Sequence, residues 1–214
     1  MQFAIYDLDR TLTRKPTFTP FLCFAARQLA PWRLALLPVW VAAMAAYRAG
    51  LCNRTQLKRF GMGLMIGPVP AGQLLEVANR FAKRRAERSG FNAPVLAMLE
   101  QDRAAGRAVL IATAAFELYA VEFARLLRVD TVIGTRWESG AIPGGNCYGA
   151  AKRDRVLAWF ADQGIDPATA RFRFVSDSFA DAPLFELADE PVFVTASRSQ
   201  AARAAKRGWA VMQP

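Results

Sequence analysis

The chain has 214 residues and a formal net charge of +10 at pH 7, a length that suits one sizeable core with a small accessory domain. It contains no histidine, which excludes serine–histidine–aspartate triads, cysteine–histidine pairs and histidine-ligated zinc sites. Its three cysteines, Cys23, Cys52 and Cys147, lack the spacing of a metal site, so we expect reduced thiols in the cytoplasm.

A short apolar segment at residues 3–6 predicts a buried parallel strand, and Asp7 and Asp9 follow it directly. The carboxyl ends of strands in an open α/β sheet face the crevice where ligands bind, so both carboxylates are expected there. Carboxylates this close repel each other unless a proton or a cation relieves them, and oxygen ligands favour Mg²⁺ over zinc. With Mg²⁺ bound, one carboxylate could attack phosphorus while the other transfers protons. An ordinary turn rich in aspartate is the simpler alternative.

Residues 14–89 predict a mostly helical insert with an unusual distribution of charge. No acidic residue occurs between Asp9 and Glu76. Nine basic residues occur in the same stretch: Arg10, Arg14, Lys15, Arg27, Arg33, Arg48, Arg54, Lys58 and Arg59. This local charge favours an anionic partner, which could be a polyanionic substrate, an acidic membrane surface or nucleic acid.

Within the insert, residues 34–47 form an apolar run without a polar face, bounded by arginines. As one helix the run would extend about 21 Å, too short to cross a hydrocarbon core of roughly 30 Å. We expect it to pair with residues 18–26 through Pro31 as a hairpin that dips into a membrane surface, with Trp32 or Trp40 near the headgroups. The alternative is burial in the core of the insert or in a dimer interface.

After about residue 90, strands alternate with helical patterns, which predicts a parallel sheet flanked by helices. The strand at residues 108–112 precedes Thr113, whose hydroxyl and neighbouring N–H groups suit a phosphate at a helix start. Lys152 begins a helical pattern and can neutralise an anionic transition state. The remaining predictions are a glycine-rich loop at residues 135–148, strands at 131–133, 172–175, 192–194 and 209–212, and two further carboxylates, Asp177 and Asp181.

Taken in order, Asp7 and Asp9, Thr113, Lys152, and Asp177 and Asp181 resemble the four motifs of the haloacid dehalogenase superfamily of phosphatases. The resemblance runs from about residue 3 to the C-terminus, and the long gap between the first two motifs is similar to the subgroup with an inserted α-helical cap. It implies an α/β fold with a Rossmann-like parallel sheet core at residues 1–13 and 90–214 and a helical cap at residues 14–89.

The resemblance also implies a role for each motif residue. Asp7 would be the nucleophile that forms an aspartyl-phosphate, and Asp9 would act as general acid and then as general base for the attacking water. Thr113 and Lys152 would hold the phosphoryl oxygens. Positioning and charge neutralisation are the main needs of phosphoryl transfer, so these roles agree with the chemistry of the side chains.

The same resemblance implies a Mg²⁺ site formed by Asp7, Asp177 and the Asp9 residue through its backbone carbonyl. Asp181 would support the metal shell or Lys152. The residues next to the motifs are candidate substrate contacts: Arg10, Thr11 and Ala114.

Substrate choice is expected to depend on the cap. Phosphoserine phosphatases of the capped subgroup carry a glutamate soon after the first motif that binds the substrate amine, whereas this chain has no acid before Glu76. The apolar, basic cap is similar to that of phosphatidylglycerophosphatase C, whose substrate carries a phosphodiester as well as the terminal phosphate, and cap arginines could pair with that second anion. We therefore expect a Mg²⁺-dependent phosphatase for an anionic membrane lipid, peripheral on the inner membrane face.

Two other functions remain open. The first is a soluble phosphatase for a small metabolite similar to phosphoserine, with its apolar cap helix packed in a homodimer. The second is a non-catalytic basic module that binds nucleic acid, which lacks a recognition motif and leaves the acidic motifs unexplained. Because the first strand carries the expected nucleophile, no removable targeting segment is predicted and a cytoplasmic location is expected.

Overall fold

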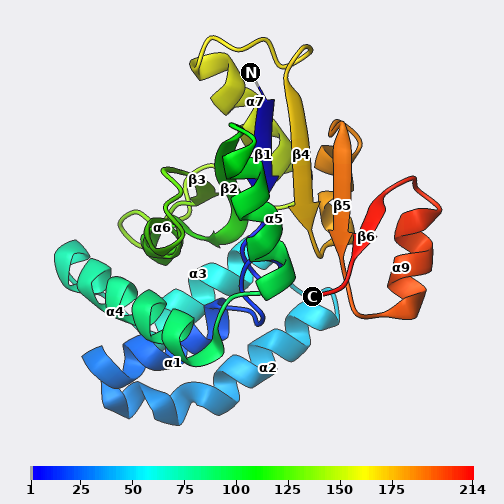
Figure 1. Cartoon of the computed structure of the whole chain (residues 1–214). Helices are drawn as coiled ribbons and strands as arrows, with labels where there is room; N and C mark the ends of the chain where they lie inside the picture. Colours follow the sequence, from blue (N-terminus) through cyan, green and yellow to red (C-terminus); the bar gives the residue numbers. More distant parts are fainter. Residues whose placement is uncertain (1) are drawn as a thin grey trace.

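Six parallel strands form one central sheet in the order β3-β2-β1-β4-β5-β6 (Figure 1). The computed structural model describes residues 2–214, so residue 1, with which the predicted core begins, lies outside the described residues. The strands are β1 (Gln2–Tyr6), β2 (Ala108–Phe116), β3 (Thr131–Thr135), β4 (Arg171–Ser176), β5 (Glu190–Val194) and β6 (Ala210–Met212). Each strand that the sequence predicts overlaps one of these six strands, and the α/β fold with a Rossmann-like parallel sheet is confirmed.

Alternate residues of the central strand β1 face opposite layers of helices. Side chains in a strand point to the two faces in turn, and accordingly Ala4 and Tyr6 belong to one hydrophobic cluster while Phe3 and Ile5 belong to the other. The first cluster includes side chains of α5 (Ala93–Ala104) and α6 (Glu117–Leu126). The second cluster lies under α7 (Ala150–Asp162), α8 (Ala182–Phe185) and α9 (Arg198–Ala205). Both faces of the sheet are therefore covered, as a parallel sheet requires.

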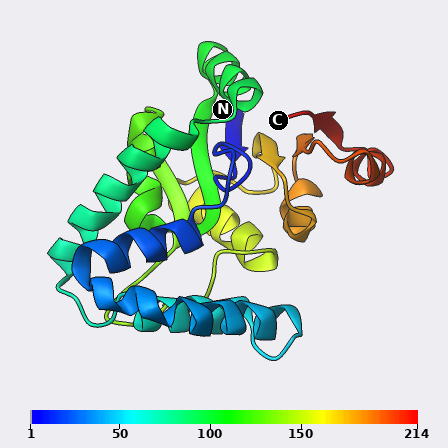
Figure 2. The same ribbon diagram turned by 90° about the horizontal axis from the view of Figure 1, so that it is seen from below.

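Four α-helices and a 3₁₀ turn occupy most of residues 14–89: α1 (Phe18–Leu29), η1 (Pro31–Leu36), α2 (Leu37–Arg48), α3 (Arg54–Met65) and α4 (Ala71–Ser89). In Figure 2 these blue to teal helices gather well away from α9. They join the core through aromatic packing, since Phe21 and Phe81 contact Tyr119 of α6 with ring centroids 4.8 and 5.7 Å away. The division into a core and a cap at residues 14 and 89 stays a prediction, and "cap" below means residues 14–89.

The apolar segment at residues 34–47 does not form the single helix that its composition predicts. A 3₁₀ helix, η1, leads into α2, with Pro38 in the first turn of α2, where a missing N–H costs no hydrogen bond. Trp40 is buried in the cap at 1% exposure, whereas Trp32 is 66% exposed. The prediction that either tryptophan contacts a membrane is therefore wrong for Trp40. Within residues 2–214, every helix is too short or too polar to traverse a bilayer.

Two glycines of α3 provide a matched test of how tightly the cap is packed. A Cβ atom added at Gly61 would lie 2.7 Å from the Trp40 ring, so Gly61→Ala is expected to destabilise the protein by about 1–3 kcal/mol through overpacking. Gly63 has no neighbour within 4 Å of the same position, so Gly63→Ala should stabilise the helix by roughly 0.5–1 kcal/mol. Urea unfolding of both variants measures the difference, and equal effects would contradict the packing.

Candidate active site

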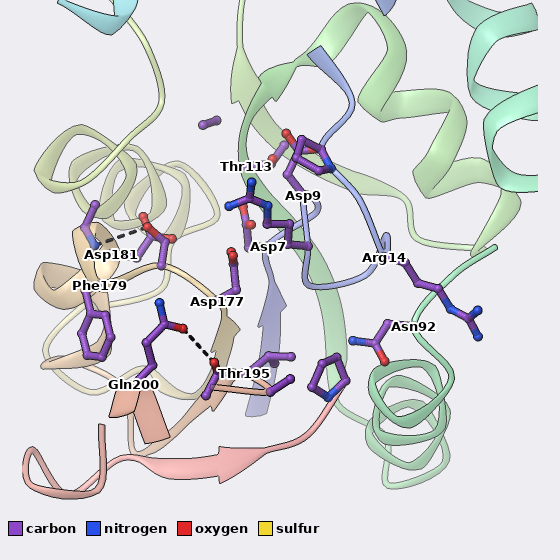
Figure 3. Close-up of a pocket in the computed structure, with 18 of the residues that line it drawn as sticks. Asp7, Asp9, Arg14, Asn92, Thr113, Asp177, Phe179, Asp181, Thr195 and Gln200 are labelled. Carbon is purple, nitrogen blue, oxygen red and sulfur yellow. Dashed lines mark hydrogen bonds between the residues drawn. The ribbon is translucent and has the colours of Figure 1, made fainter. Parts of the chain in front are cut away.

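The predicted motifs meet around one cavity of about 1130 Å³ at the carboxyl edge of the sheet (Figure 3). The parallel register pairs Tyr6 of β1 with Ile111 of β2 and with Val175 of β4, so the residues that follow these three positions share an edge. Helix α7 and the 3₁₀ helix η2 (Phe179–Asp181) supply the other two motif residues. All six predicted catalytic and metal residues line the cavity: Asp7, Asp9, Thr113, Lys152, Asp177 and Asp181.

Lys152 forms the centre of a buried ion network. Its Nζ lies 2.9 Å from Oδ1 of Asp7 and 2.7 Å from Oδ2 of Asp181, and Ser176 donates a second hydrogen bond to that Asp181 oxygen at 2.8 Å. Burial alone would lower the pKa of Lys152, but the carboxylates of Asp181 and Asp7 outweigh it and hold the pKa above its usual value. Burial also raises the pKa of Asp7, to about 6, although Lys152 opposes the shift. The lysine is therefore a fixed cation beside the expected nucleophile.

Asp177 is held at the cavity through its main chain. Its N–H donates to the hydroxyl of Thr11 at 3.0 Å. Burial, with the nearby charge of Asp7, raises the pKa of Asp177 to about 7. Thr11 itself is fully buried and does not line the cavity, so the structure gives it this supporting contact instead of the predicted contact with substrate.

The carboxylate of Asp9 is bound to the beginning of the cap. Its Oδ1 accepts hydrogen bonds from the N–H of Thr17 at 2.9 Å and from the Thr17 hydroxyl at 2.7 Å. Burial raises the pKa of Asp9, and the Thr17 hydroxyl opposes that shift. Among residues 2–214, no group donates a hydrogen bond to Oδ2 of Asp9, and both described hydrogen bonds of this carboxylate go to Oδ1. The pairing with Thr17 has no signature in the sequence around Asp9.

Thr113 lies inside β2 and not at the helix start that the sequence predicts. Strand β2 continues to Phe116, and its register against β3 shifts between Ala112 and Phe116. In this irregular segment the Thr113 hydroxyl accepts a hydrogen bond from the N–H of Ala115 at 3.0 Å. Thr113 and Ala114 both line the cavity. We call this irregular strand segment, residues 113–115, the β2 turn.

The cavity is also lined by residues outside the four motifs. Arg10, a predicted substrate contact, lines it from a left-handed backbone position at φ 60°. The others were not identified from the motifs. Arg54 of α3 joins Arg10, with its guanidinium 3.9 Å from the ring centroid of Tyr148. Asn92, at 1% exposure, lines the cavity with both side-chain polar atoms unpartnered among the described residues. Only the acid-free stretch of the insert could have signalled Arg54, and no local signal marks Tyr148 or Asn92.

The donor atoms of the cavity fit a hard divalent cation such as Mg²⁺. Asp7 and Asp177 supply two carboxylates, and their burial raises both pKa values, so two bare negative charges are disfavoured there. The buried Oδ1 of Asp181 has no partner among residues 2–214. In those residues no three Asp, Glu or Cys side chains converge closely enough to hold an ion by themselves, so binding needs main-chain or water oxygens as well. Mg²⁺ commonly takes one or two carboxylates and keeps several waters.

Comparison with known proteins assigns the family. The family model of haloacid dehalogenase-like hydrolases matches residues 4–186, which is most of the chain. The chain belongs to this family. It is therefore a hydrolase of the phosphatase type, and the predicted superfamily is confirmed.

Three similar proteins show how far the likeness of this haloacid dehalogenase-like hydrolase extends. Protein CicA of Caulobacter vibrioides is 29% identical over 192 residues, which cover 86% of this chain and 82% of CicA. A histidinol-phosphatase of Neisseria meningitidis serogroup C is 30% identical over 128 residues, 56% of this chain and 58% of that enzyme. A crystal structure of a Bordetella pertussis Tohama I protein of unknown function has a TM-score of 0.87 at 26% identity and covers 99% of this chain and 97% of its own. The last match extends over the cap as well as the core.

Proposed function

We propose that this hydrolase removes the terminal phosphate of an anionic membrane lipid such as phosphatidylglycerophosphate at the inner membrane face. The charge of the cavity carries the proposal. Beyond the motif residues, the charged side chains that line the cavity are those of Arg10, Arg14 and Arg54, and no further Asp or Glu of residues 2–214 lines it. Guanidinium groups pair bidentately with phosphodiester oxygens, so the arginines provide for a second anion beside the phosphate that is cleaved.

The proposed reaction uses the carboxylates in two steps. A carboxylate oxygen of Asp7 attacks phosphorus, the bond from phosphorus to the leaving oxygen breaks, and Asp9 protonates that oxygen. Asp9 then removes a proton from the water that hydrolyses the aspartyl-phosphate and regenerates Asp7. Lys152 and the β2 turn hold the phosphoryl oxygens throughout, since charge neutralisation and alignment account for most of such catalysis.

The proposed cofactor is Mg²⁺, held by Asp7, Asp177 and the backbone oxygen of Asp9. When bound, Mg²⁺ supplies positive charge to the phosphoryl group. Asp181 supports this metal site chiefly by fixing Lys152 through the 2.7 Å ion pair. Its unpartnered Oδ1 is free to accept a hydrogen bond from water at the cation.

The outer face of α2 provides the proposed membrane contact. Every exposed residue of α2 before Arg48 is apolar: Pro38, Val39, Val41, Ala42 and Ala45. Trp32 of the preceding 3₁₀ helix is exposed as well. Arg33 precedes α2 but is held within the cap, because its guanidinium donates to the carbonyls of Gly63 and Leu64 at 2.8 and 2.7 Å. An apolar helix face next to basic residues is typical of contact with anionic lipid surfaces.

Phosphate release in mixed micelles tests the substrate and the surface together. Phosphatidylglycerophosphate is expected to be hydrolysed faster than soluble phosphoserine or histidinol phosphate. Val41→Asp should lower the activity on micelles and leave activity on soluble substrates unchanged, because it places a charge where the lipid would bury it. Arg48→Gln should weaken co-sedimentation with anionic vesicles chiefly at low salt, since headgroup attraction is screened over about 8 Å at physiological ionic strength.

Val121→Asp is the matched control for this experiment. Val121 lies on α6 of the core and is 55% exposed, close to the 57% of Val41. The Val121→Asp variant should bind vesicles as the wild type does. If Val41→Asp also binds vesicles normally but dissociates a dimer in solution, the α2 face is a protein interface and the lipid proposal fails.

A soluble phosphatase for a small metabolite is the second candidate, favoured by the similarity to a histidinol-phosphatase. The substrate of such an enzyme carries an amine. Every Asp or Glu side chain of residues 2–214 that lines the cavity belongs to the motif set. An amine in this cavity would therefore have to compete with Lys152 or the cation for them, and for this reason we propose the lipid phosphate first.

A further inference from the structure

A lysine of the cap reaches the β2 turn of the core. Lys58 lies on α3 and is 6% exposed. Its Nζ donates hydrogen bonds to the carbonyl oxygen of Ala114 and, at 2.6 Å, to Oδ1 of Asn146, which lies in the loop before α7. It also lies 4.9 Å from the ring centroid of Phe116. One cap side chain thus connects three segments that are distant in the sequence.

Among residues 2–214, no acidic side chain lies within salt-bridge distance of Lys58. A buried charge that lacks an ion-pair partner opposes folding. Burial, with the nearby charge of Arg54, lowers the pKa of Lys58 to about 7, although the charge of Asp9 opposes the shift. The neutral amine still carries two N–H donors, enough for both of its acceptors. Hydrogen-bond donation is therefore available in either protonation state.

The Ala114 carbonyl accepts hydrogen bonds from side chains at the point where β2 and β3 lose their regular register. Besides Lys58, the donor within reach is the hydroxyl of Thr135, 2.8 Å from the Ala114 oxygen and 2.8 Å from Oδ1 of Asn146. A hydroxyl has one proton and can satisfy only one of the two oxygens at a time. Lys58 supplies the donors that Thr135 lacks, so it fixes the peptide next to Thr113.

We propose that Lys58 is a positioning residue that fixes the β2 turn for phosphate binding. The geometry of the β2 turn then depends on the contact between the cap and the core. The inference rests on the proposed function, in which the β2 turn holds phosphoryl oxygens. Lys58 does not line the cavity and acts through Ala114. Cap and phosphate site are then energetically coupled by one amine, whatever the leaving group.

The test compares Lys58→Met with Arg59→Met, which alters an exposed neighbour on the same helix. With p-nitrophenyl phosphate as a soluble probe, Lys58→Met is expected to lower kcat by about 10²-fold, as small misplacements of a reacting group do. The inhibition constant for inorganic phosphate should rise along with this loss. The Tm should change little, since removal of a buried amine that lacks an ion-pair partner offsets the loss of its two hydrogen bonds. Arg59→Met should match the wild type in all three measurements.

Thr135→Val extends the test, because it removes the other donor to Ala114. Its effect on kcat should exceed additivity when combined with Lys58→Met, as expected for residues that share one acceptor. The proposal is overturned if Lys58→Met keeps the wild-type kcat and phosphate inhibition, or if only its Tm falls. If Asp7→Asn is inactive in the same assay, such a result refutes the role of Lys58 alone; if Asp7→Asn is also active, the proposed function fails with it.

Discussion

Replacing Asp7 with asparagine is expected to abolish phosphate release. The amide is a poor nucleophile for phosphorus, and removal of the group that forms the covalent intermediate should cost on the order of 10⁴-fold in rate or more. The fold should survive, because Lys152 keeps its ion pair with Asp181 at 2.7 Å. Phosphate release from p-nitrophenyl phosphate under saturating Mg²⁺ measures the loss.

Asp9→Asn is the matched comparison in the same cavity. It should slow turnover by about 10² to 10⁴, the range for loss of a general acid or base. Its amide oxygen can still accept the hydrogen bonds of Thr17, which separates proton transfer from the tie to the cap. Thermal unfolding of both variants is the control for folding. Retained activity in Asp7→Asn would end the covalent mechanism.

Removal of Mg²⁺ is expected to stop turnover, and Asp177→Asn should raise the Mg²⁺ concentration for half-maximal activity by more than about tenfold. Loss of a partner that only orients a metal ligand already costs roughly 10- to 100-fold in metal affinity, and Asp177 is proposed as a ligand itself. A chelator titration followed by Mg²⁺ addition makes the measurement. Undiminished turnover in excess chelator would refute the metal role.

The Mg²⁺ requirement should also depend on pH with a defined sign. Burial raises the pKa of Asp177 to about 7 and that of Asp7 to about 6, so protons compete with Mg²⁺ as the pH falls through this range. Without Mg²⁺, the folded pKa values of these carboxylates exceed their unfolded values. The free energy of unfolding of the protein should therefore fall as the pH rises from about 4 to 7. Mg²⁺ should therefore raise Tm more at pH 8 than at pH 5.5, and calorimetry can check this without an activity assay.

Local sequence patterns were sufficient for the sheet and for the motif positions. Apolar segments predict the strands, and parallel strands bring their carboxyl ends to one edge, so Asp7 and Asp177 could be placed together before any contact was known. The helix start expected after residue 112 was wrong, since β2 runs on to Phe116. Its extra length comes from pairing with β3, which a local pattern does not contain.

The burial of the cap helices could not be predicted from composition. Trp40 and Trp32 lie in the same apolar context, yet Trp40 is buried and Trp32 is exposed. Their difference depends on Gly61, which leaves room for the Trp40 ring from a separate helix. Hydrophobicity gives the tendency of a side chain to leave water and does not identify its partner.

The sequence by itself determined the family and the set of motif carboxylates, because motif spacing and side-chain type can be read along the chain. Only the tertiary structure decided the contacts between cap and core: Thr17 on Asp9, Lys58 on the Ala114 carbonyl, and Arg54 in the cavity. Lys58 and Ala114 are 56 positions apart in the chain. Such contacts depend on how two separately encoded surfaces dock, which is a matter of shape and complementary donors and leaves no periodic trace in the sequence.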